Sequence, residues 1–164
     1  MKTNKIKNLV DLREIVKTLH LNGKKIVFTN GCFDILHIGH VDYLRKSKAL
    51  GDILIVGLNS DDSVKRLKGE TRPINNLASR AAVLEALVMV DYVVAFEEDT
   101  PYEVIKALKP DVYTKGGDYN MNNVIGPGLG SDIIEQYGGK VELIPCIEGV
   151  STTNILTKHR AVIN

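Results

Sequence analysis

The sequence predicts an α/β domain, a Rossmann-like open parallel sheet of about five strands with helices on both faces. Short segments rich in valine and isoleucine alternate with segments that have helical periodicity, as parallel βαβ units do. Glycine and polar residues follow these segments, at the edge where such sheets bind their ligands. The expected strands span residues 24–30, 52–59, 91–96, 111–117 and 140–145.

Helices in the first half of the chain are indicated by apolar spacing and by strong helix formers. Apolar residues recur at helical spacing between Leu9 and Leu19 in a leading segment, residues 1–24, and Asn22-Gly23 closes this helix. Further helices are expected over 41–50, 61–67 and 77–90.

Helices in the second half are indicated mainly by capping signals. Thr100 to Glu103 has the pattern of a capping box with Pro101 at the first helical position, so we expect a helix that stops at Pro110. A glycine-rich stretch, 125–130, precedes a helix over 131–139. Ser151 is expected to cap a last helix over 152–160.

Composition narrows the classes of function. The 164 residues fit one domain, 1–164, in which a core over 25–160 follows the leading helix. A net charge of +1 does not suggest binding to nucleic acid or to a membrane surface, and the longest apolar run is too short to span a bilayer. Cys32 and Cys146 lie far apart, which indicates neither a disulfide framework nor a zinc site and favours a cytoplasmic protein.

The segment after the first strand suits an anion. Gly31 lets backbone N–H groups approach a phosphate closely, and His37 and His40 flank a glycine at a helix N-terminus, which favours negative charge. Two imidazoles at this spacing can both donate hydrogen bonds to one phosphate chain as a phosphoanhydride bond breaks. The alternatives are that both are ordinary loop histidines or that they form a zinc site, but no third cysteine or histidine for zinc lies close in the sequence.

The segment GCFDILHIGH resembles the HxGH signature of the nucleotidyltransferase superfamily, which includes cytidylyltransferases, phosphopantetheine adenylyltransferase and class I tRNA synthetases. The run Ser151 to Ile155 looks like the second phosphate-binding signature of the same superfamily. No KMSKS-type loop of a synthetase is present in the sequence. The resemblance implies a single nucleotidyltransferase domain with a cytidylyltransferase-like core.

Longer segments resemble the bacterial D-glycero-β-D-manno-heptose 1-phosphate adenylyltransferase family in its stand-alone form, over roughly residues 24–160. These segments are NGCFDILHIGHVDYL, LNSDDSVKRLKGETRPIN, VDYVVAFEEDTP, DVYTKGGDY and EGVSTTNI. The resemblance implies transfer of AMP from ATP to the sugar 1-phosphate, giving ADP-heptose and pyrophosphate for lipopolysaccharide or surface-glycan synthesis. It also implies Mg²⁺ bound with ATP and held by phosphates, with no metal site from the protein alone. Because dimers are the commonest closed assemblies, we expect a homodimer or a higher homo-oligomer.

Motif positions and the resemblance assign roles to individual residues. The expected catalytic residues are His37, His40 and Lys48, the last two helical turns after His40. Residues expected to bind the nucleotide are Thr29, Gly31, Cys32, Phe33, Asp61, Arg80, Lys115, Gly116, Gly117, Asp118, Ser151, Thr152 and Thr153. Candidates for contact with the acceptor or its phosphate are Asp34, Lys68 and Arg72.

Several of these residues have a structural alternative. Lys48 is otherwise a surface lysine, Asp61 a helix N-cap, and Arg80 a salt-bridge residue within a helix. Lys68 and Arg72 belong to a basic cluster that is otherwise a solvated surface. The acidic run 97–99 is interpreted as the lead into a helix.

Two departures from the related patterns bear on specificity. The cytidylyltransferase pattern has an arginine where this chain has Cys146 and Ile147, which favours adenine over cytosine. The glycine- and proline-rich stretch 125–130 differs from the heptose family and leaves the sugar open. The alternatives are a cytidylyltransferase acting on glycerol 3-phosphate or another polyol or sugar phosphate, a guanylyltransferase for a heptose phosphate, and a non-catalytic nucleotide-binding sensor.

Overall fold

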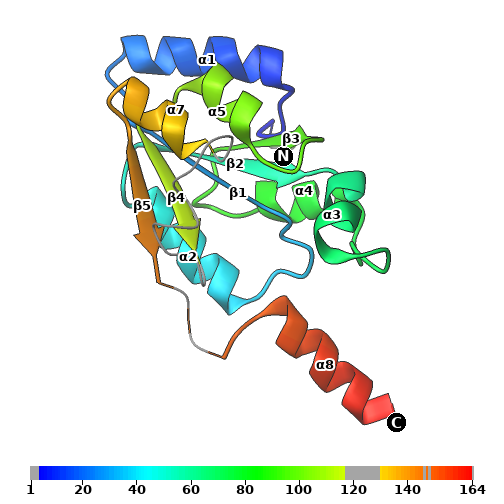
Figure 1. Cartoon of the computed structure of the whole chain (residues 1–164). Coiled ribbons are helices and arrows are strands. Elements are labelled where there is room, and N and C mark those ends of the chain that lie inside the picture. Colours follow the sequence, from blue (N-terminus) through cyan, green and yellow to red (C-terminus); the bar gives the residue numbers. More distant parts are fainter. Residues whose placement is uncertain (1–3, 117–129, 146, 148, 164) are drawn as a thin grey trace.

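A computed structural model describes residues 4–116, 130–145, 147 and 149–163, with the backbone alone at 131 and 158–163. In this part of the chain five strands form one parallel sheet in the order β3-β2-β1-β4-β5 (Figure 1). The strands are β1 (Ile26–Gly31), β2 (Ile53–Asn59), β3 (Tyr92–Phe96), β4 (Val112–Gly116) and β5 (Lys140–Ile144). The predicted fold class is therefore confirmed.

The order of the strands creates a switch point beside the central strand. The chain proceeds from β1 through β2 to β3, then crosses back to place β4 on the other side of β1. In parallel sheets of this kind the crevice at the carboxyl ends of the two diverging strands is the usual ligand site. Figure 1 shows β4 and β5 pointing toward the start of α8 (Thr152–Ile163), the last helix.

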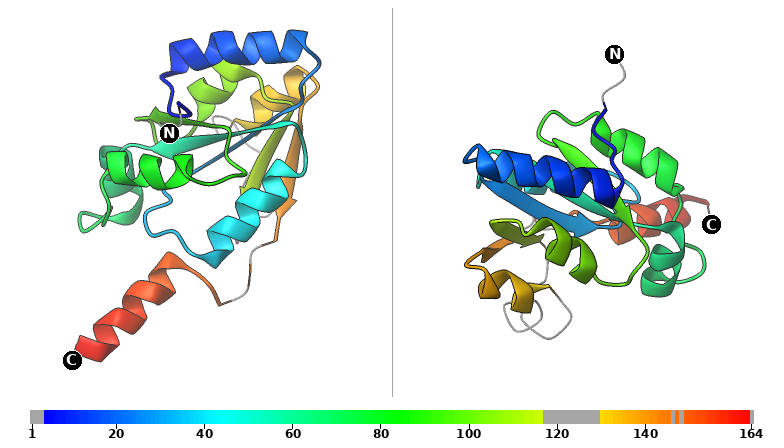
Figure 2. Two further views of the ribbon diagram at one scale, coloured as in Figure 1. Left: turned by 180° about the vertical axis from the view of Figure 1, so that it is seen from behind. Right: turned by 90° about the horizontal axis from the view of Figure 1, so that it is seen from above.

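Helices cover both faces of the sheet (Figure 2). On one face lie α1 (Leu9–Leu21), α5 (Tyr102–Leu108) and α7 (Ser131–Gln136), and on the other lie α2 (Ile38–Lys48) and α4 (Leu77–Glu85). A short helix, α3 (Asp61–Lys68), follows β2 directly. Helix α8 extends away from the sheet in both side views (Figures 1 and 2).

Alternate residues of the central strands divide the core into two layers. Phe28 and Ile55 pack with α1 and α5, whereas Val27 and Leu54 pack with α2 and α4, and all four are fully buried. This alternation follows from the pleat of a strand, which points successive side chains to opposite faces. Because both faces are covered, the start of β1 and most of β2 are apolar, whereas the edge strand β5 exposes Lys140 and Glu142.

Side-chain caps fix the starts of several helices. Asn8 Oδ1 accepts a hydrogen bond from the N–H of Asp11, and Asn76 Oδ1 accepts one from the N–H of Ser79. The predicted cap at Ser151 is confirmed, because its Oγ accepts from the N–H of Asn154 at 3.1 Å. Each cap satisfies a backbone donor that the first helical turn leaves without a partner.

The structure corrects two predicted helix ends and one predicted helix cap. Helix α2 begins at Ile38 rather than near residue 41. Helix α4 ends at Glu85 rather than at residue 90, because Val90 is buried and the next N–H, of Asp91, bonds to the Leu54 carbonyl and draws the chain into the sheet. The capping box at the start of α5 is wrong, since Pro101 itself is the N-cap and no side chain caps this helix.

Residues before α1 cover the outer edge of β3. The Val93 N–H donates to the Lys5 carbonyl at 3.0 Å, and the Lys7 N–H donates to the Val93 carbonyl at 2.9 Å. These bonds pair the open side of an edge strand, which would otherwise offer its backbone to another chain. The leading segment thus protects the sheet edge as well as supplying a helix. Among the described residues, no helix combines the length and apolar character that crossing a bilayer requires.

Candidate active site

A cleft of about 1040 Å³ lies at the carboxyl edge of the sheet, at the switch point between β1 and β4. It is lined by the loop after β1, the end of β4, the start of α8 and residues after β2 and β3. Thirteen of the residues singled out in the sequence line it: Gly31, Cys32, Phe33, Asp34, His37, His40, Lys68, Arg72, Lys115, Gly116, Ser151, Thr152 and Thr153.

His37 and His40 form a stacked pair at the N-terminus of α2. Their ring centroids are 3.8 Å apart, and the ring planes differ by 21°. Gly39 makes room for this arrangement, because a Cβ at that position would lie 3.0 Å from His37 Nδ1. Both Nδ1 atoms are buried, and neither has a hydrogen-bond partner among the described residues. Unpaired buried nitrogens are costly in a folded protein, so they mark a position suited to a ligand.

Burial keeps both imidazoles neutral near pH 7. It lowers the pKa of His37 and lowers that of His40 to about 4. For His40, the charge of His37 lowers the pKa further by a smaller amount, and a hydrogen bond from the ring to the backbone of Ile35 opposes both effects. A neutral imidazole has one N–H donor and one acceptor nitrogen. Without ligand, the pair therefore presents oriented dipoles rather than positive charge.

Phe33 supports the pair from the loop after β1. Its ring lies 5.2 Å from the His40 ring, centroid to centroid, and its side chain is buried. The backbone of Phe33 has a φ of +43°, a conformation that costs energy for any residue with a side chain. Gly31 allows the turn, since a Cβ there would come within 3.0 Å of the Phe33 ring. Local strain thus sits beside the two histidines.

Lys115, at the end of β4, supplies a cation beside the histidines. Its Nζ donates to Asn30 Oδ1 at 2.8 Å and lies 5.3 Å from the centre of the Tyr113 ring. Burial lowers the pKa of Lys115 to about 8, so the ammonium form still predominates at pH 7. A desolvated ammonium group attracts a phosphate more strongly than one exposed to water.

The start of α8 faces the same cleft. Thr152 Oγ1 donates to the Ile35 carbonyl at 3.5 Å, which connects this helix to the loop that carries the histidines. Ser151 and Thr153 line the cleft on either side of Thr152. A twelve-residue helix concentrates partial positive charge at its N-terminus, where an anion is favoured.

Asp34 is an anchor for a loop and not a free carboxylate. It is 4% exposed and accepts hydrogen bonds from Arg72 Nε at 2.6 Å and from the N–H groups of Ile74 and Asn75. Burial alone would raise the pKa of Asp34, but these backbone donors and the guanidinium group hold it below its usual value. Asp34 thus holds the loop that carries Arg72, and both residues line the cleft, so a contact of Asp34 with the acceptor stays a prediction.

Arg80 is buried behind the cleft and does not line it. Its guanidinium group donates to the Cys32 carbonyl at 2.7 Å, to Asp61 Oδ1 at 2.8 Å and to the Asn75 carbonyl at 3.0 Å. These bonds join the loop after β1 to the start of α3 and the start of α4. The expected nucleotide contact of Arg80 is wrong for this conformation, and Asp61 is its partner rather than a cap, because Ser60 caps α3.

Lys48 and Thr29 also make contacts within the fold rather than with the cleft. The Lys48 ammonium group bonds the Asp52 carbonyl and, at 2.5 Å, Asp91 Oδ2, which lie at the opposite edge of the sheet from the cleft. Two helical turns carry the chain away from His40 along α2, so the predicted phosphate contact of Lys48 is wrong. Thr29 is fully buried, and its hydroxyl bonds to Tyr43 beneath the cleft, so its side chain is not available to a ligand either. Gly117 and Asp118 lie outside the described residues.

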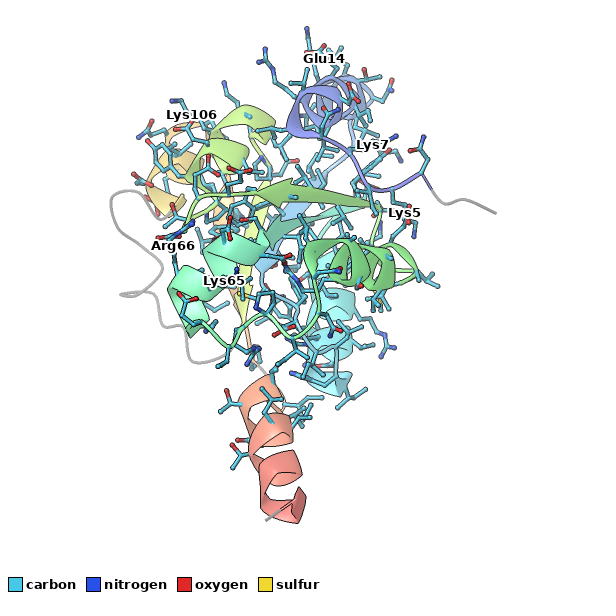
Figure 3. All side chains as sticks on the ribbon, turned by 90° about the vertical axis from the view of Figure 1, so that its right-hand side faces the viewer. Lys5, Lys7, Glu14, Lys65, Arg66 and Lys106 are labelled. Carbon is cyan, nitrogen blue, oxygen red and sulfur yellow. The ribbon has the colours of Figure 1, made fainter. Side chains whose placement is uncertain are left out.

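The basic cluster after β2 divides between the surface and the cleft. Lys65 and Arg66 project from α3 at the surface (Figure 3). Arg66 Nε donates to Asp99 Oδ1 at 2.8 Å, which ties α3 to the segment after β3. Asp99 itself lines the cleft, although the sequence analysis interpreted the acidic run only as a lead into a helix.

Four further residues of the cleft were not predicted from the sequence. Asn30, Tyr43, Asn59 and Thr100 all line it. Asn59 ends β2 and Asn30 is the last residue but one of β1, and this position at the ligand edge is a signal that could have found them. Tyr43 gave no such signal, because a tyrosine inside a helix most often belongs to the core.

Comparison with known sequences gives the family. The sequence model of the cytidylyltransferase-like family matches residues 28–158, and the chain belongs to this family.

Two curated proteins are similar to nearly the whole of this chain. A protein of Geobacter metallireducens named bifunctional protein HldE is 56% identical over 154 residues, which cover 94% of this chain and 31% of that protein. The protein of the same name from Nitratiruptor sp. is 58% identical over 156 residues, covering 95% of this chain and 32% of its own length. The chain thus spans about a third of the length of these curated relatives.

Two solved structures share the fold. The lipopolysaccharide core biosynthesis protein from Thermoplasma volcanium is 33% identical with a TM-score of 0.60, and the match covers 76% of this chain and 98% of that chain. Pantoate-β-alanine ligase from Francisella tularensis, complexed with a β,γ form of ATP and β-alanine, has a TM-score of 0.61 and covers 97% of this chain and 78% of that one. Its 16% identity shows the fold alone.

The lowered pKa of Lys115 predicts how nucleotide affinity depends on pH. Affinity for ATP should fall as pH rises through about 8, because the ammonium group near the cleft loses its proton there. Isothermal titration calorimetry with ATP from pH 6.5 to 9.5 measures the effect. Lys115→Arg keeps its charge over this range and should remove the pH dependence. An identical pH profile for the wild type and Lys115→Arg would show that Lys115 does not bind the nucleotide.

Proposed function

We propose that the chain transfers AMP from ATP to D-glycero-β-D-manno-heptose 1-phosphate and releases pyrophosphate, making ADP-heptose for lipopolysaccharide or another surface glycan. The observation that carries the proposal is the stacked pair His37 and His40, whose buried Nδ1 atoms lack partners among the described residues, in a cleft shared with the N-terminus of α8. The resemblance in sequence supplies the sugar. The Thermoplasma relative, described as a lipopolysaccharide core biosynthesis protein, agrees with a glycan precursor as product.

The proposed reaction is a single in-line displacement. An oxygen of the sugar 1-phosphate attacks the α-phosphorus of ATP, a new P–O bond forms, and the bond to the bridging oxygen breaks. Pyrophosphate leaves with that electron pair. No protein base is required, since a phosphate oxygen is already anionic, so the contribution of the protein is positioning and stabilisation of charge.

Each group of residues in the cleft has a proposed task. The imidazole N–H groups of His37 and His40 donate to phosphate oxygens that gain charge as the bridging bond breaks. Lys115 and the N-terminus of α8 hold the triphosphate. Lys68 and Arg72, which also line the cleft, hold the phosphate of the acceptor.

Magnesium is proposed to enter with ATP. Among the described residues, no group of three or more His, Cys, Asp or Glu side chains is placed to hold a metal ion. The carboxylate of Asp34, which lines the cleft, is already engaged by Arg72 and two backbone N–H groups. With Asp34 engaged in this way, the cleft suits a Mg²⁺ ion that is coordinated mainly by the phosphates of ATP. Such an ion would neutralise charge on the triphosphate.

We also propose a cytoplasmic location, which fits a reaction that consumes ATP, and a homodimer or higher homo-oligomer. Light scattering after size-exclusion chromatography tests the assembly, and a mass of one chain, 18.1 kDa, would contradict it.

Removal of one histidine should slow the reaction more than it weakens binding. For His40→Ala we expect turnover to fall on the order of 10²–10³, as loss of a transition-state donor typically does, with a much smaller change in the Kd for ATP. Single-turnover kinetics and calorimetry measure the two quantities. His20→Ala is the matched control, because His20 bonds Asp111 on the far side of the sheet. Turnover near the wild-type value in His40→Ala would remove this residue from the chemistry.

The choice of substrates is tested by a coupled pyrophosphate assay. ATP, CTP and GTP are each paired with the β- and α-anomers of heptose 1-phosphate and with glycerol 3-phosphate. We expect fastest release from ATP with the β-anomer. Fastest release from CTP with glycerol 3-phosphate would instead assign the chain to the cytidylyltransferase alternative. Tight nucleotide binding without pyrophosphate from any pair would contradict an enzymatic function.

A further inference from the structure

Four hydroxyl groups form a buried cluster between α2 and the sheet. Thr29 Oγ1 lies 2.6 Å from the Tyr43 hydroxyl, which donates to Thr114 Oγ1 at 3.1 Å. Ser47 Oγ lies 3.0 Å from the same Thr114 oxygen. Thr29, Ser47 and Thr114 are fully buried, and Tyr43 is 7% exposed. The cluster is therefore a sequestered polar network directly below the cleft.

The cluster spans the two strands that part at the switch point. Thr29 on β1 and Thr114 on β4 are partners in the parallel register. Tyr43 and Ser47 come from neighbouring turns of α2, and His40 lies one turn before Tyr43. The hydroxyl groups thus connect the helix that begins with the histidine pair to both strands beneath it.

The ring of Tyr43 is held as closely as its hydroxyl. A Cβ on Gly116 would lie 2.7 Å from the ring, so only glycine lets the end of β4 approach α2 this closely. Gly116 and Tyr43 both line the cleft. The ring therefore fixes the distance between α2 and β4 next to Lys115.

A buried polar cluster at this place needs a reason other than stability. Replacing all partners of such a network with apolar groups of the same shape is often nearly neutral for stability. Hydrogen bonds differ from apolar packing in that they require particular distances and angles. A helix held only by apolar contacts has more freedom to rotate or slide over a sheet, and the four hydroxyl groups restrict this freedom at one end of α2.

We propose that the Tyr43 hydroxyl is a positioning group that sets the depth and rotation of α2 on β1 and β4, and thereby keeps His37 and His40 stacked at the cleft. Tyr43 acts through the histidines and does not itself touch the reacting atoms. The kinetic consequence rests on the proposed function, whereas the effect on the histidine rings does not.

The test is Tyr43→Phe, which removes only the oxygen. We expect kcat for pyrophosphate release to fall about tenfold with little change in the KM for ATP, since small displacements of catalytic groups cost rate more than binding. In the nucleotide-free protein, the ring signals of His37 and His40 in a ¹H–¹³C NMR spectrum should shift. Both results together support a positioning role.

Matched variants separate positioning from general destabilisation. Tyr137→Phe also removes one hydroxyl, which donates to the Pro110 carbonyl on the other face of the sheet, so kcat and the histidine signals should stay at wild-type values. Thr29→Ser keeps a hydroxyl in the cluster and should retain most of the activity, whereas Thr29→Val should behave like Tyr43→Phe. If Tyr43→Phe does not fold, the two Thr29 variants carry the test.

The outcomes are distinguishable. Wild-type kcat and unchanged histidine signals in Tyr43→Phe would overturn the proposal, as would a loss of kcat with unchanged signals. A wild-type protein without nucleotidyltransferase activity, whose histidine signals still shift in Tyr43→Phe, would contradict the proposed function and support the positioning role.

Discussion

The candidate site depends on how α2 leaves the central strand at the switch point. The loop after β1 turns through the strained backbone of Phe33 and places His37 at the N-cap of α2. Gly39 then allows the two imidazoles to stack without a clash. Because burial removes positive charge from the rings, the site is built from oriented dipoles that need no large rearrangement when a phosphate chain arrives.

Charged groups near the cleft divide into those that hold loops and those that face the opening. Arg80 and Asp34 are buried and use their hydrogen-bonding groups to fix the loops around the cleft. Lys68, Lys115 and Arg72 line the cleft. Arg72 does both, because it pairs with the buried Asp34 and also lines the cleft, and the three cations favour an anionic ligand. A chain with a net charge of only +1 can thus gather several cations at one cleft.

The sequence predicted the fold class and the histidine pair, because apolar periodicity and glycine positions are local signals. It could not predict which charged side chains the fold would bury or pair. Lys48 lies on the same helix as His40, but its distance along α2 takes it to the far edge of the sheet. Arg80 finds its acceptors only when Cys32 and Asp61, distant in sequence, meet in the fold. Helix ends such as that of α4 were misplaced because burial of Val90 outweighs helix propensity.

The most direct test of the account is a crystal structure of the protein with α,β-methylene ATP, whose bridging carbon prevents transfer. We predict that imidazole nitrogens of His37 and His40 lie within about 3.2 Å of oxygens of the triphosphate, as hydrogen bonds require. A nucleotide bound with both rings turned away from its phosphates, or a metal ion held by the two histidines, would contradict the central claim.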